Sequence, residues 1–452
     1  MSGLGKRLWV GVGIVALVTA LAAGAWAQES AGTAAAPPTP APKIDSGDTA
    51  WLLVSSALVL LMTPGLAFFY GGLVRKKNVL SILMQCFAIL CLISLQWVLF
   101  GYSLAFGPDV KGLIGNLSWA GLKTVGQAPY ADYSATIPHL VFMIFQAMFA
   151  IITPALIIGA FAERMKFSTF CVFSVIWATL VYDPLAHWVW GVGGFLRNMG
   201  ALDFAGGTVV HINAGVAALV ATIVLRRRIG YPEIASPPHN LPFAVLGAGL
   251  LWFGWFGFNA GSALAANGLA ANAFVATHVA TAMAGLTWAA IDWFVYRKAT
   301  TLGVITGAVA GLVAITPACG FVSPMNAIWV GLGAAAICYF FVAVIKPKFG
   351  YDDTLDAFGV HGIGGIWGAL ATGLWAQKAI NPAGADGLFY GNPMQFVIQL
   401  KAVLVTFAFS FVATFIILKV LDLVMGARVA EHDERVGLDL TQHKEAGYTV
   451  LD

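Results

Sequence analysis

Two histidines of this chain lie in long apolar segments, where an ionisable side chain is costly and is usually functional. His211 and His361 each follow a valine, with glycine and alanine nearby. A neutral imidazole has one donor and one acceptor, so two imidazoles can share a hydrogen bond and pass a proton along it. A single histidine in an apolar helix is more often a core residue. Two histidines at corresponding positions of an internal repeat favour a pore lining. Metal binding is the alternative, although no convincing third ligand lies in the apolar segments.

Two carboxylates accompany the histidines. Asp203 precedes His211 by eight residues, with glycines between them, and Asp356 lies shortly before His361. The spacing of Asp203 predicts an irregular helix start, where a carboxylate accepts hydrogen bonds from exposed backbone amides and complements the positive helix end. We therefore expect a structural role for Asp203 rather than direct contact with a substrate.

Aromatic residues alternate with glycine in the segment 250–262. Trp252 and Phe253 are typical of an aromatic belt at a membrane interface. Phe258 differs, because the string Gly-Phe-Asn-Ala-Gly-Ser around it is too polar and too flexible for such a belt. We expect Phe258 to face a lumen.

The elements that carry these residues are long and apolar. Of the 452 residues, 59% are hydrophobic and only 10% are charged, whereas soluble domains carry about 25% charged residues. A helix needs about 20 apolar residues to span a bilayer. The sequence therefore predicts an all-α membrane protein with eleven transmembrane helices, near 48–73, 79–106, 137–161, 168–189, 207–226, 243–263, 271–295, 300–318, 326–345, 358–377 and 396–424.

Other classes of protein fit the composition poorly. The net charge of +3 is too small to indicate a nucleic-acid partner. No nucleophile–base set, zinc-ligand spacing or Walker-type phosphate loop is present, so we expect no enzyme, no cofactor, no metal and no ATP-driven pump. The cysteines lack paired spacing, so we expect them to be reduced and to serve in packing. They are Cys86, Cys91, Cys171, Cys319 and Cys338.

The N-terminus has the layout of a secretory signal peptide. Lys6 and Arg7 precede an apolar run, and Ala25-Trp26-Ala27 has the small-x-small pattern of a cleavage site. The alternative is an additional uncleaved helix. The predicted organisation is a signal peptide at 1–27, a disordered periplasmic lead at 28–47, a membrane domain at 48–425 and a cytoplasmic tail at 426–452.

The basic residues predict the orientation in the membrane. Alternate loops carry twelve Lys and Arg residues, at 75–77, 164–166, 226–228, 297–298 and 346–348. The intervening loops carry five, which are Lys111, Lys123, Arg197, Lys378 and Lys401. We therefore expect a protein of the cell inner membrane with its mature N-terminus outside and its C-terminus in the cytoplasm.

The chain also resembles itself. The string Ile-Thr-Pro-Ala occurs at 152–155 in the third predicted span and at 315–318 in the eighth. Val210-His211 opens the fifth span and Val360-His361 opens the tenth. An offset of five spans predicts a 5+5 inverted repeat followed by one C-terminal helix, with the path of the substrate between the halves.

Three longer strings closely resemble the ammonium transporter family (Amt/Mep/Rh), and specifically its bacterial Amt branch. They lie at 203–211, 255–262 and 356–362, and the similarity runs from about Trp51 to Asp439. The resemblance implies an eleven-helix protomer in a homotrimer with one pore in each protomer. It also implies ammonium, ammonia and methylammonium as substrates, contact with membrane lipid, and a tail on which a P-II-type signalling protein docks.

The resemblance assigns roles to particular residues. The family's functional positions are matched by the vestibule residues Phe149, Trp190 and Ser262, the stacked pore gate of Phe149 and Phe258, the twin histidines His211 and His361, and the structural Asp203. The segment after Trp190 departs from the family's usual Trp-Gly-Gly-Gly, because it reads Gly-Val-Gly-Gly.

Electrostatics fits such a function. Moving a bare ammonium ion into a medium of low dielectric costs on the order of tens of kcal/mol, whereas a cation–π contact returns only about 0.5–2 kcal/mol. We therefore expect ammonium to be gathered at an aromatic mouth and to lose its proton before ammonia crosses. Potassium has no proton to lose and is excluded. The alternative function is an ammonium sensor with little transport, although only about 28 residues follow the last predicted span.

Overall fold

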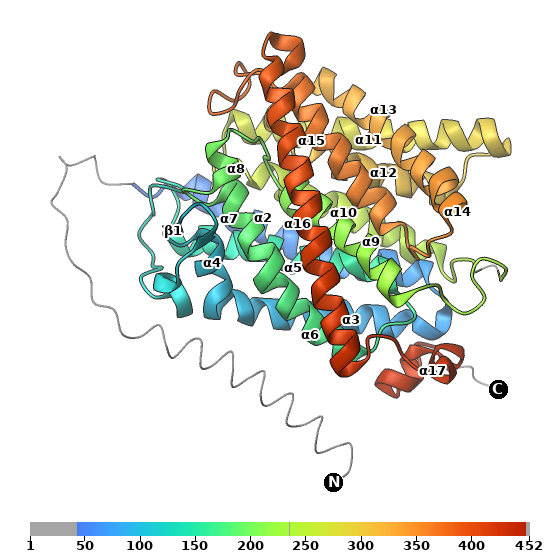
Figure 1. Cartoon of the computed structure of the whole chain (residues 1–452). Coiled ribbons are helices and arrows are strands. Elements are labelled where there is room, and N and C mark those ends of the chain that lie inside the picture. Colours follow the sequence, from blue (N-terminus) through green and yellow to red (C-terminus); the bar gives the residue numbers. More distant parts are fainter. Residues whose placement is uncertain (1–42, 235, 449–452) are drawn as a thin grey trace.

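The computed structural model describes residues 43–234 and 236–448, which form a helical bundle with the C-terminal tail at one end (Figure 1). A helix lies within each of the eleven predicted ranges. The helices are α2 (Ser46–Leu73), α3 (Val79–Gln96) with η3 (Trp97–Gly101) and α4 (Tyr102–Phe106), α5 (His139–Phe161), α6 (Phe167–Trp177) with η5 (Ala178–Tyr182) and α7 (Asp183–Trp190), η6 (Gly207–Ile212) with α9 (Asn213–Leu225), α10 (Leu241–Gly261), α11 (Gly268–Tyr296), α12 (Thr301–Ile315), α13 (Pro324–Phe340) with η7 (Phe341–Ile345) and α14 (Lys346–Phe349), η8 (Phe358–Gly362) with α15 (Ile363–Trp375), and α16 (Pro393–Met425).

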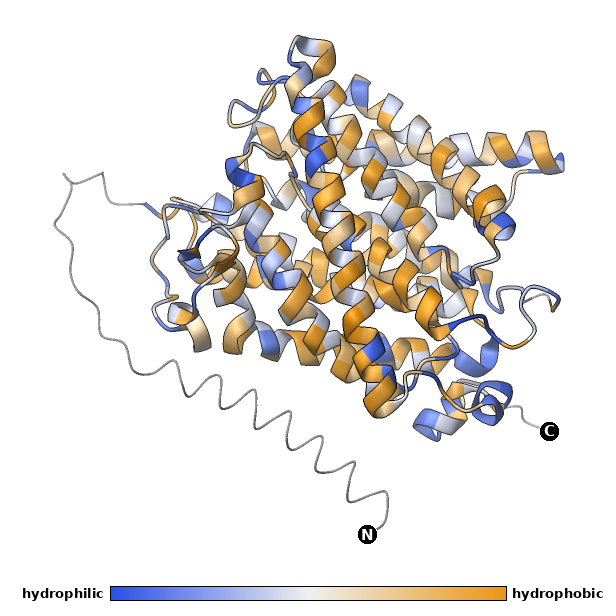
Figure 2. Ribbon diagram, in the orientation of Figure 1, coloured by the Kyte–Doolittle hydropathy of each residue, from blue (hydrophilic) through white to orange (hydrophobic). Residues whose placement is uncertain are grey.

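Nine of these helices in the described part of the chain are long and apolar enough to cross a membrane. Hydrophobic residues run along the helices, and hydrophilic ones gather in the loops and the tail (Figure 2). The protein is therefore a multi-pass membrane protein. The remaining two predicted spans, near 300–318 and 358–377, are not among the nine, and α12 ends at Ile315, three residues before the predicted boundary. The count of eleven spans stays a prediction.

The two histidine-bearing segments cross in direct backbone contact. A Cβ added to Gly215 in α9 would lie 2.1 Å from the backbone nitrogen of Gly362 in η8. A Cβ on Gly365 in α15 would lie 3.0 Å from the Cβ of His211. Only glycine allows these approaches, so the small residues around the histidines bring the two halves of the sequence together.

A short β-hairpin lies before α5 and is an exception to the all-α prediction. Strands β1 (Asp109–Val110) and β2 (Ile114–Gly115) pair antiparallel, followed by the 3-10 segment η4 (Leu117–Leu122). The short helix α8 (Phe195–Asn198) lies against this hairpin, since the amide of Phe195 donates to the carbonyl of Gly112.

The opposite end of the bundle is closed by an ion-pair network. Glu163 binds Arg75 at 2.7 Å and Arg228 at 3.1 Å, and Arg228 also binds Asp352 at 2.9 Å. Burial alone would raise the pKa of Glu163, but the two arginines lower it to about 2. The network therefore joins the loops that follow α2, α5 and α9 and the loop that precedes η8.

The tail packs on the same end through α17 (Glu431–Val436) and η10 (Asp439–His443). The carboxylate of Asp439 accepts from the amides of Leu80 and Ser81, and Glu434 accepts from the amide of Ile229. The predicted signal peptide and most of the predicted lead lie outside the described residues. At the end of that lead, Asp45 caps α2 by accepting from the amide of Asp48.

Candidate functional site

Both histidines lie in single π-helical turns, η6 and η8, at the start of their helices. Asp203 fixes the first of these turns, as its spacing predicts. Its carboxylate accepts from four successive backbone amides at 2.6 to 3.2 Å and from the hydroxyl of Thr208. The amide donors are Gly206, Gly207, Thr208 and Val209.

The second turn has a counterpart that sequence reasoning missed. Asp353 also stands eight residues before its histidine, and its carboxylate accepts from the amides of Ala357 at 3.0 Å and Phe358 at 2.8 Å. Burial and the neighbouring Asp356 raise the pKa of Asp353 to about 7. The signal that could have found it is the eight-residue spacing shared with Asp203 and His211.

Asp356, the carboxylate that lies shortly before His361, has a different role. It precedes η8 with φ +60 and forms an ion pair with Lys346. Its side chain is 26% exposed. The carboxylate of Asp356 thus pairs with a cation on α14 and does not cap the turn that carries His361.

The structure brings His211 and His361 together. Their rings are nearly parallel, with an interplanar angle of 21° and centroids 5.4 Å apart. Among the described residues no hydrogen bond joins them, contrary to the shared bond considered from the sequence. Both nitrogens of His211 and Nδ1 of His361 are buried without a partner in the described protein. The described part of the chain contains no group of three or more His, Cys, Asp or Glu side chains placed to hold a metal ion.

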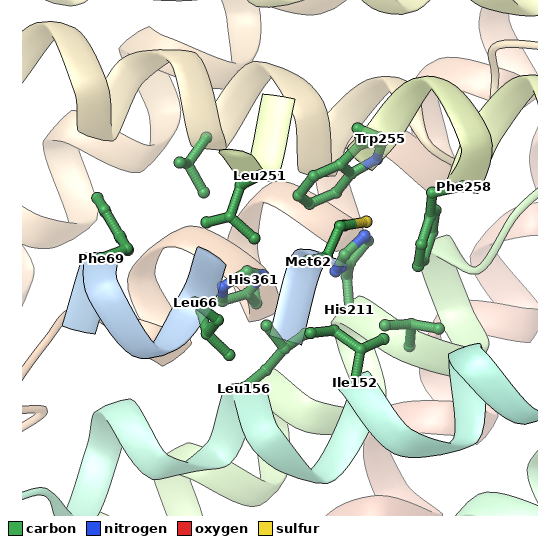
Figure 3. Close-up of a pocket in the computed structure, with 12 residues that line it drawn as sticks. Met62, Leu66, Phe69, Ile152, Leu156, His211, Leu251, Trp255, Phe258 and His361 are labelled. Atoms are coloured by element: carbon green, nitrogen blue, oxygen red, sulfur yellow. The ribbon is translucent and has the colours of Figure 1, made fainter. Parts of the chain in front are cut away.

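A narrow apolar cavity runs along the two imidazoles. Its volume is about 10 Å³, which is about the smallest space that holds one water molecule. Figure 3 shows its lining, with Phe258 at one end, the two histidines between, and Phe69 at the other end. The remaining wall consists of the indole of Trp255, the thioether of Met62 and aliphatic side chains. A molecule of the size of water or ammonia fits there, and the imidazole nitrogens are the polar groups that it meets.

Trp255 is a further residue of this cavity that the sequence did not single out as lining. Its indole lies over His211 with the ring centroids 5.4 Å apart, and its Nε1 donates to Thr316 Oγ1 at 2.8 Å. Thr316 belongs to the repeated Ile-Thr-Pro-Ala string, which was the only available signal. The contact holds the indole against the imidazole.

A wider pocket of about 160 Å³ contains the three predicted vestibule residues, Phe149, Trp190 and Ser262. The indole Nε1 of Trp190 donates to the carbonyl of Asp203 at 2.9 Å, so the same aspartate supports the pocket and the histidine turn. The hydroxyl of Ser262 donates to the carbonyl of Phe258 at 2.9 Å. Asp132, Gln146 and Arg197 also line the pocket and were missed, because they come from a loop, from a uniformly apolar helix and from the short helix α8.

Two phenylalanines separate this outer pocket from the histidine cavity. Phe149 lines the outer pocket and Phe258 lines the cavity. Their ring centroids are 4.3 Å apart, with a tilt of 36° instead of a parallel stack. Both rings are buried and lie between the two pockets.

A third pocket of about 370 Å³ lies beyond the histidines, at the end of the bundle where the tail docks. It shares Phe69, Val309 and His361 with the histidine cavity and contains the carboxylates Asp292 and Asp356. The three pockets therefore follow one another through the protein. The phenylalanine pair lies between the 160 Å³ pocket and the histidine cavity, and Phe69, Val309 and His361 line both the histidine cavity and the third pocket.

Comparison with known proteins agrees with this arrangement. The model of the Ammonium Transporter Family matches residues 50–448. The chain belongs to the ammonium transporter family. An ammonium transporter of Bacillus subtilis is 54% identical over 402 residues, which cover 89% of this chain and 98% of that relative. The relatives of this family are named as transporters, in agreement with the expectation that the chain is not an enzyme.

Solved structures of the family have the same fold. Candida albicans Mep2 superimposes with a TM-score of 0.82 and 37% identity, covering 86% of this chain and 88% of that one. A structure named as a sensor Amt protein has a TM-score of 0.80 and 29% identity, covering 88% of this chain and 98% of that one. The family therefore includes a protein named for sensing as well as transporters.

Proposed function

We propose that this protein is an ammonium transporter that gathers ammonium in the outer pocket, removes its proton and conducts ammonia past His211 and His361 to the cytoplasm. The observation that carries the proposal is the series of three pockets, in which a polar, aromatic mouth leads through a closed phenylalanine pair to a cavity as small as one ammonia molecule. Family membership supports ammonium as the substrate.

The outer pocket is suited to an ammonium ion. Phe149 and Trp190 present rings 5.8 Å apart with an interplanar angle of 85°, and the Ser262 hydroxyl oxygen is available as an acceptor. A cation–π contact contributes about 0.5–2 kcal/mol. That is enough to concentrate the ion at a wet mouth, and the same site takes methylammonium.

The histidine cavity is suited to ammonia and not to the ion. Its lining is apolar apart from the imidazoles, and a bare cation would lose hydration worth on the order of tens of kcal/mol there. Ammonia donates and accepts hydrogen bonds, so it can bind the unpartnered imidazole nitrogens in turn. We assign the imidazoles the relay of the released proton, because they are the ionisable groups of this cavity.

Purified protein in liposomes tests the function. We expect an ammonium gradient to drive ammonia uptake, with one charge moved for each ammonium if the imidazoles relay the proton and none if ammonia crosses alone. Ammonium-evoked current and internal pH are recorded together, with potassium at the same concentration as the control. Absence of uptake, or a potassium current of equal size, would contradict the proposal.

An ammonium sensor with little transport is the second candidate, favoured by the likeness to the sensor Amt protein. The two candidates differ in flux. A sensor binds ammonium in the outer pocket and passes little of it, so a saturable binding signal without uptake in the liposome experiment would favour sensing.

The proposed topology places the mature N-terminus in the periplasm and the C-terminus in the cytoplasm of an inner-membrane protein with eleven spans. We expect a C-terminal fluorescent-protein fusion to be bright and a C-terminal alkaline phosphatase fusion to be inactive in bacterial cells, because alkaline phosphatase requires export. The same pair of reporters placed after Lys378, in a loop on the opposite side, should give the reverse result. The opposite pattern of activity at the two sites would refute the proposed orientation.

We further propose a homotrimer, in line with the resemblance described above, in which glycine and alanine faces allow close packing of helices in lipid. The mass of the protein in mild detergent tests it. The docked tail forms a surface on which a P-II-type protein could bind, as the resemblance implies.

A further inference from the structure

A buried histidine outside the transport path makes two hydrogen bonds at the outer end of the bundle. His187 lies in α7, three residues before Trp190, and is fully buried. Its Nδ1 is 3.0 Å from the carbonyl oxygen of Ala105, and its Nε2 is 2.8 Å from Oδ1 of Asp109. The imidazole thereby connects α7 to α4 and to the β-hairpin.

Both partners of His187 are acceptors. A neutral imidazole carries a single N–H and can satisfy one of them, whereas the imidazolium donates to both. Asp109 is suited to the ionised state, since its carboxylate also accepts from the amide of Gly112 at 2.8 Å. Although desolvation opposes it, the hydrogen bond from His187 lowers the pKa of Asp109. The Asp109 side chain is 30% exposed, so this ion pair is in contact with the outer solution.

The segment after Trp190 wraps around this pair. A Cβ added to Gly191 would lie 2.5 Å from Nδ1 of His187, and one added to Gly193 would lie 2.5 Å from the Cβ of Asp109. Gly193 has φ +96, a conformation that glycine adopts without strain. The position of Trp190, whose indole lines the outer pocket, thus depends on two side chains that do not touch that pocket.

Few other charges face His187. The titratable or charged groups on α7, on the hairpin and on the elements packed against α7, including α5 and α16, are Tyr102, Asp109, Lys111, His139, Tyr182, Asp183, Arg197, His211, Lys401, Lys419 and Asp422. Of these, Asp109 is the one that bonds to the ring. Arg197 instead donates to the carbonyl of Trp190 at 2.7 Å.

We propose that His187 and Asp109 are positioning residues that form a protonation-dependent clip, which holds the Trp190 segment and so sets the affinity of the outer pocket for ammonium. The inference rests on the proposed function of that pocket. The imidazolium can donate to both acceptors, the carbonyl of Ala105 and the carboxylate of Asp109, whereas the neutral ring can donate to only one of them. The clip is therefore complete when His187 carries both ring protons and is incomplete when it carries one.

The test combines a spectroscopic and a kinetic measurement on the full-length protein. Histidine-labelled protein is examined by NMR between about pH 5 and pH 8, the range in which histidine usually titrates, and the His187 signal is assigned by its loss in His187→Gln. We expect an imidazolium at His187 in the wild type. In Asp109→Asn, which keeps the shape of the side chain and removes its charge, the imidazolium should be lost at a lower pH.

The kinetic arm measures methylammonium uptake in liposomes. For Asp109→Asn near neutral pH we expect KM to rise about fivefold with the maximal rate almost unchanged, in keeping with the net contribution of about one hydrogen bond. The KM of the wild type should rise with pH, and that of the variant should not. Asp386→Asn is the matched control, since Asp386 caps another outer turn by accepting from the amide of Lys378; it should behave as the wild type does.

The clip would be overturned by a neutral His187 in the wild type at low pH, or by an Asp109→Asn variant with the KM and pH profile of the wild type. A lower maximal rate with unchanged KM would also overturn it, because that indicates a merely structural role. A wild type that carries no methylammonium would refute the proposed function instead, and the NMR measurement would still decide the protonation of His187.

Discussion

Replacement of both His211 and His361 by alanine should abolish ammonium-evoked current in liposomes while leaving the protein folded. The two imidazoles are the ionisable groups of the narrow cavity, and the buried nitrogens of His211 and Nδ1 of His361 have no other partner in the described protein. A positioned acid or base contributes about 100-fold to 10,000-fold to a proton transfer. We therefore expect the current to fall by about 100-fold or more.

Single variants are less decisive, because the enlarged cavity admits water. A file of water molecules could replace one imidazole, carry the proton past the remaining one and admit other cations. Ammonium current and potassium leak are therefore measured together in the wild type, in each single variant and in the double variant. His278→Ala is the matched control, since this exposed histidine lies on α11 beside Trp252 and outside the three pockets. Unchanged ammonium current in the double variant would refute the relay and leave the histidines as pore lining.

The pattern of apolar segments predicted most of the fold, because a bilayer requires long apolar helices whatever their tertiary contacts. The predictions fail where the chain does not form a long apolar helix. The β-hairpin at Asp109–Gly115 is extramembrane and too short for a periodic pattern. Helix α12 ends at Ile315 because its last predicted residues form a turn around Pro317 instead.

The candidate site was predictable in the residues that follow a motif and not in those that depend on tertiary contacts. The spacing of Asp203 and His211 predicted the capped turn, and the same spacing should have pointed to Asp353. The pairing of Asp356 with Lys346 could not be predicted, because Lys346 lies in a separate helix and the sequence does not show which carboxylate will meet a cation. The orientation of the two imidazole rings likewise depends on how α9 and η8 cross.

The second large effect is expected at Asp203. The change Asp203→Ala removes the acceptor of four backbone amides and of the Thr208 hydroxyl at once. Each buried polar group left unpaired costs about 1–3 kcal/mol. Because the same residue's carbonyl accepts from Trp190, the loss reaches both the outer pocket and the turn that carries His211. We expect transport to disappear and the melting temperature to fall.

Asp353 provides an internal comparison for this prediction. It caps the corresponding turn in the second half of the chain but accepts from only two amides. If the cost grows with the number of amides left unpaired, Asp353→Ala should lower the melting temperature less than Asp203→Ala. Asp203→Asn should lie between the wild type and Asp203→Ala, because the amide oxygen still accepts while the amino group opposes the remaining donors. Wild-type uptake by well-folded Asp203→Ala protein would show that the turn holds His211 in place without this carboxylate, and the capping argument would then fail for both halves.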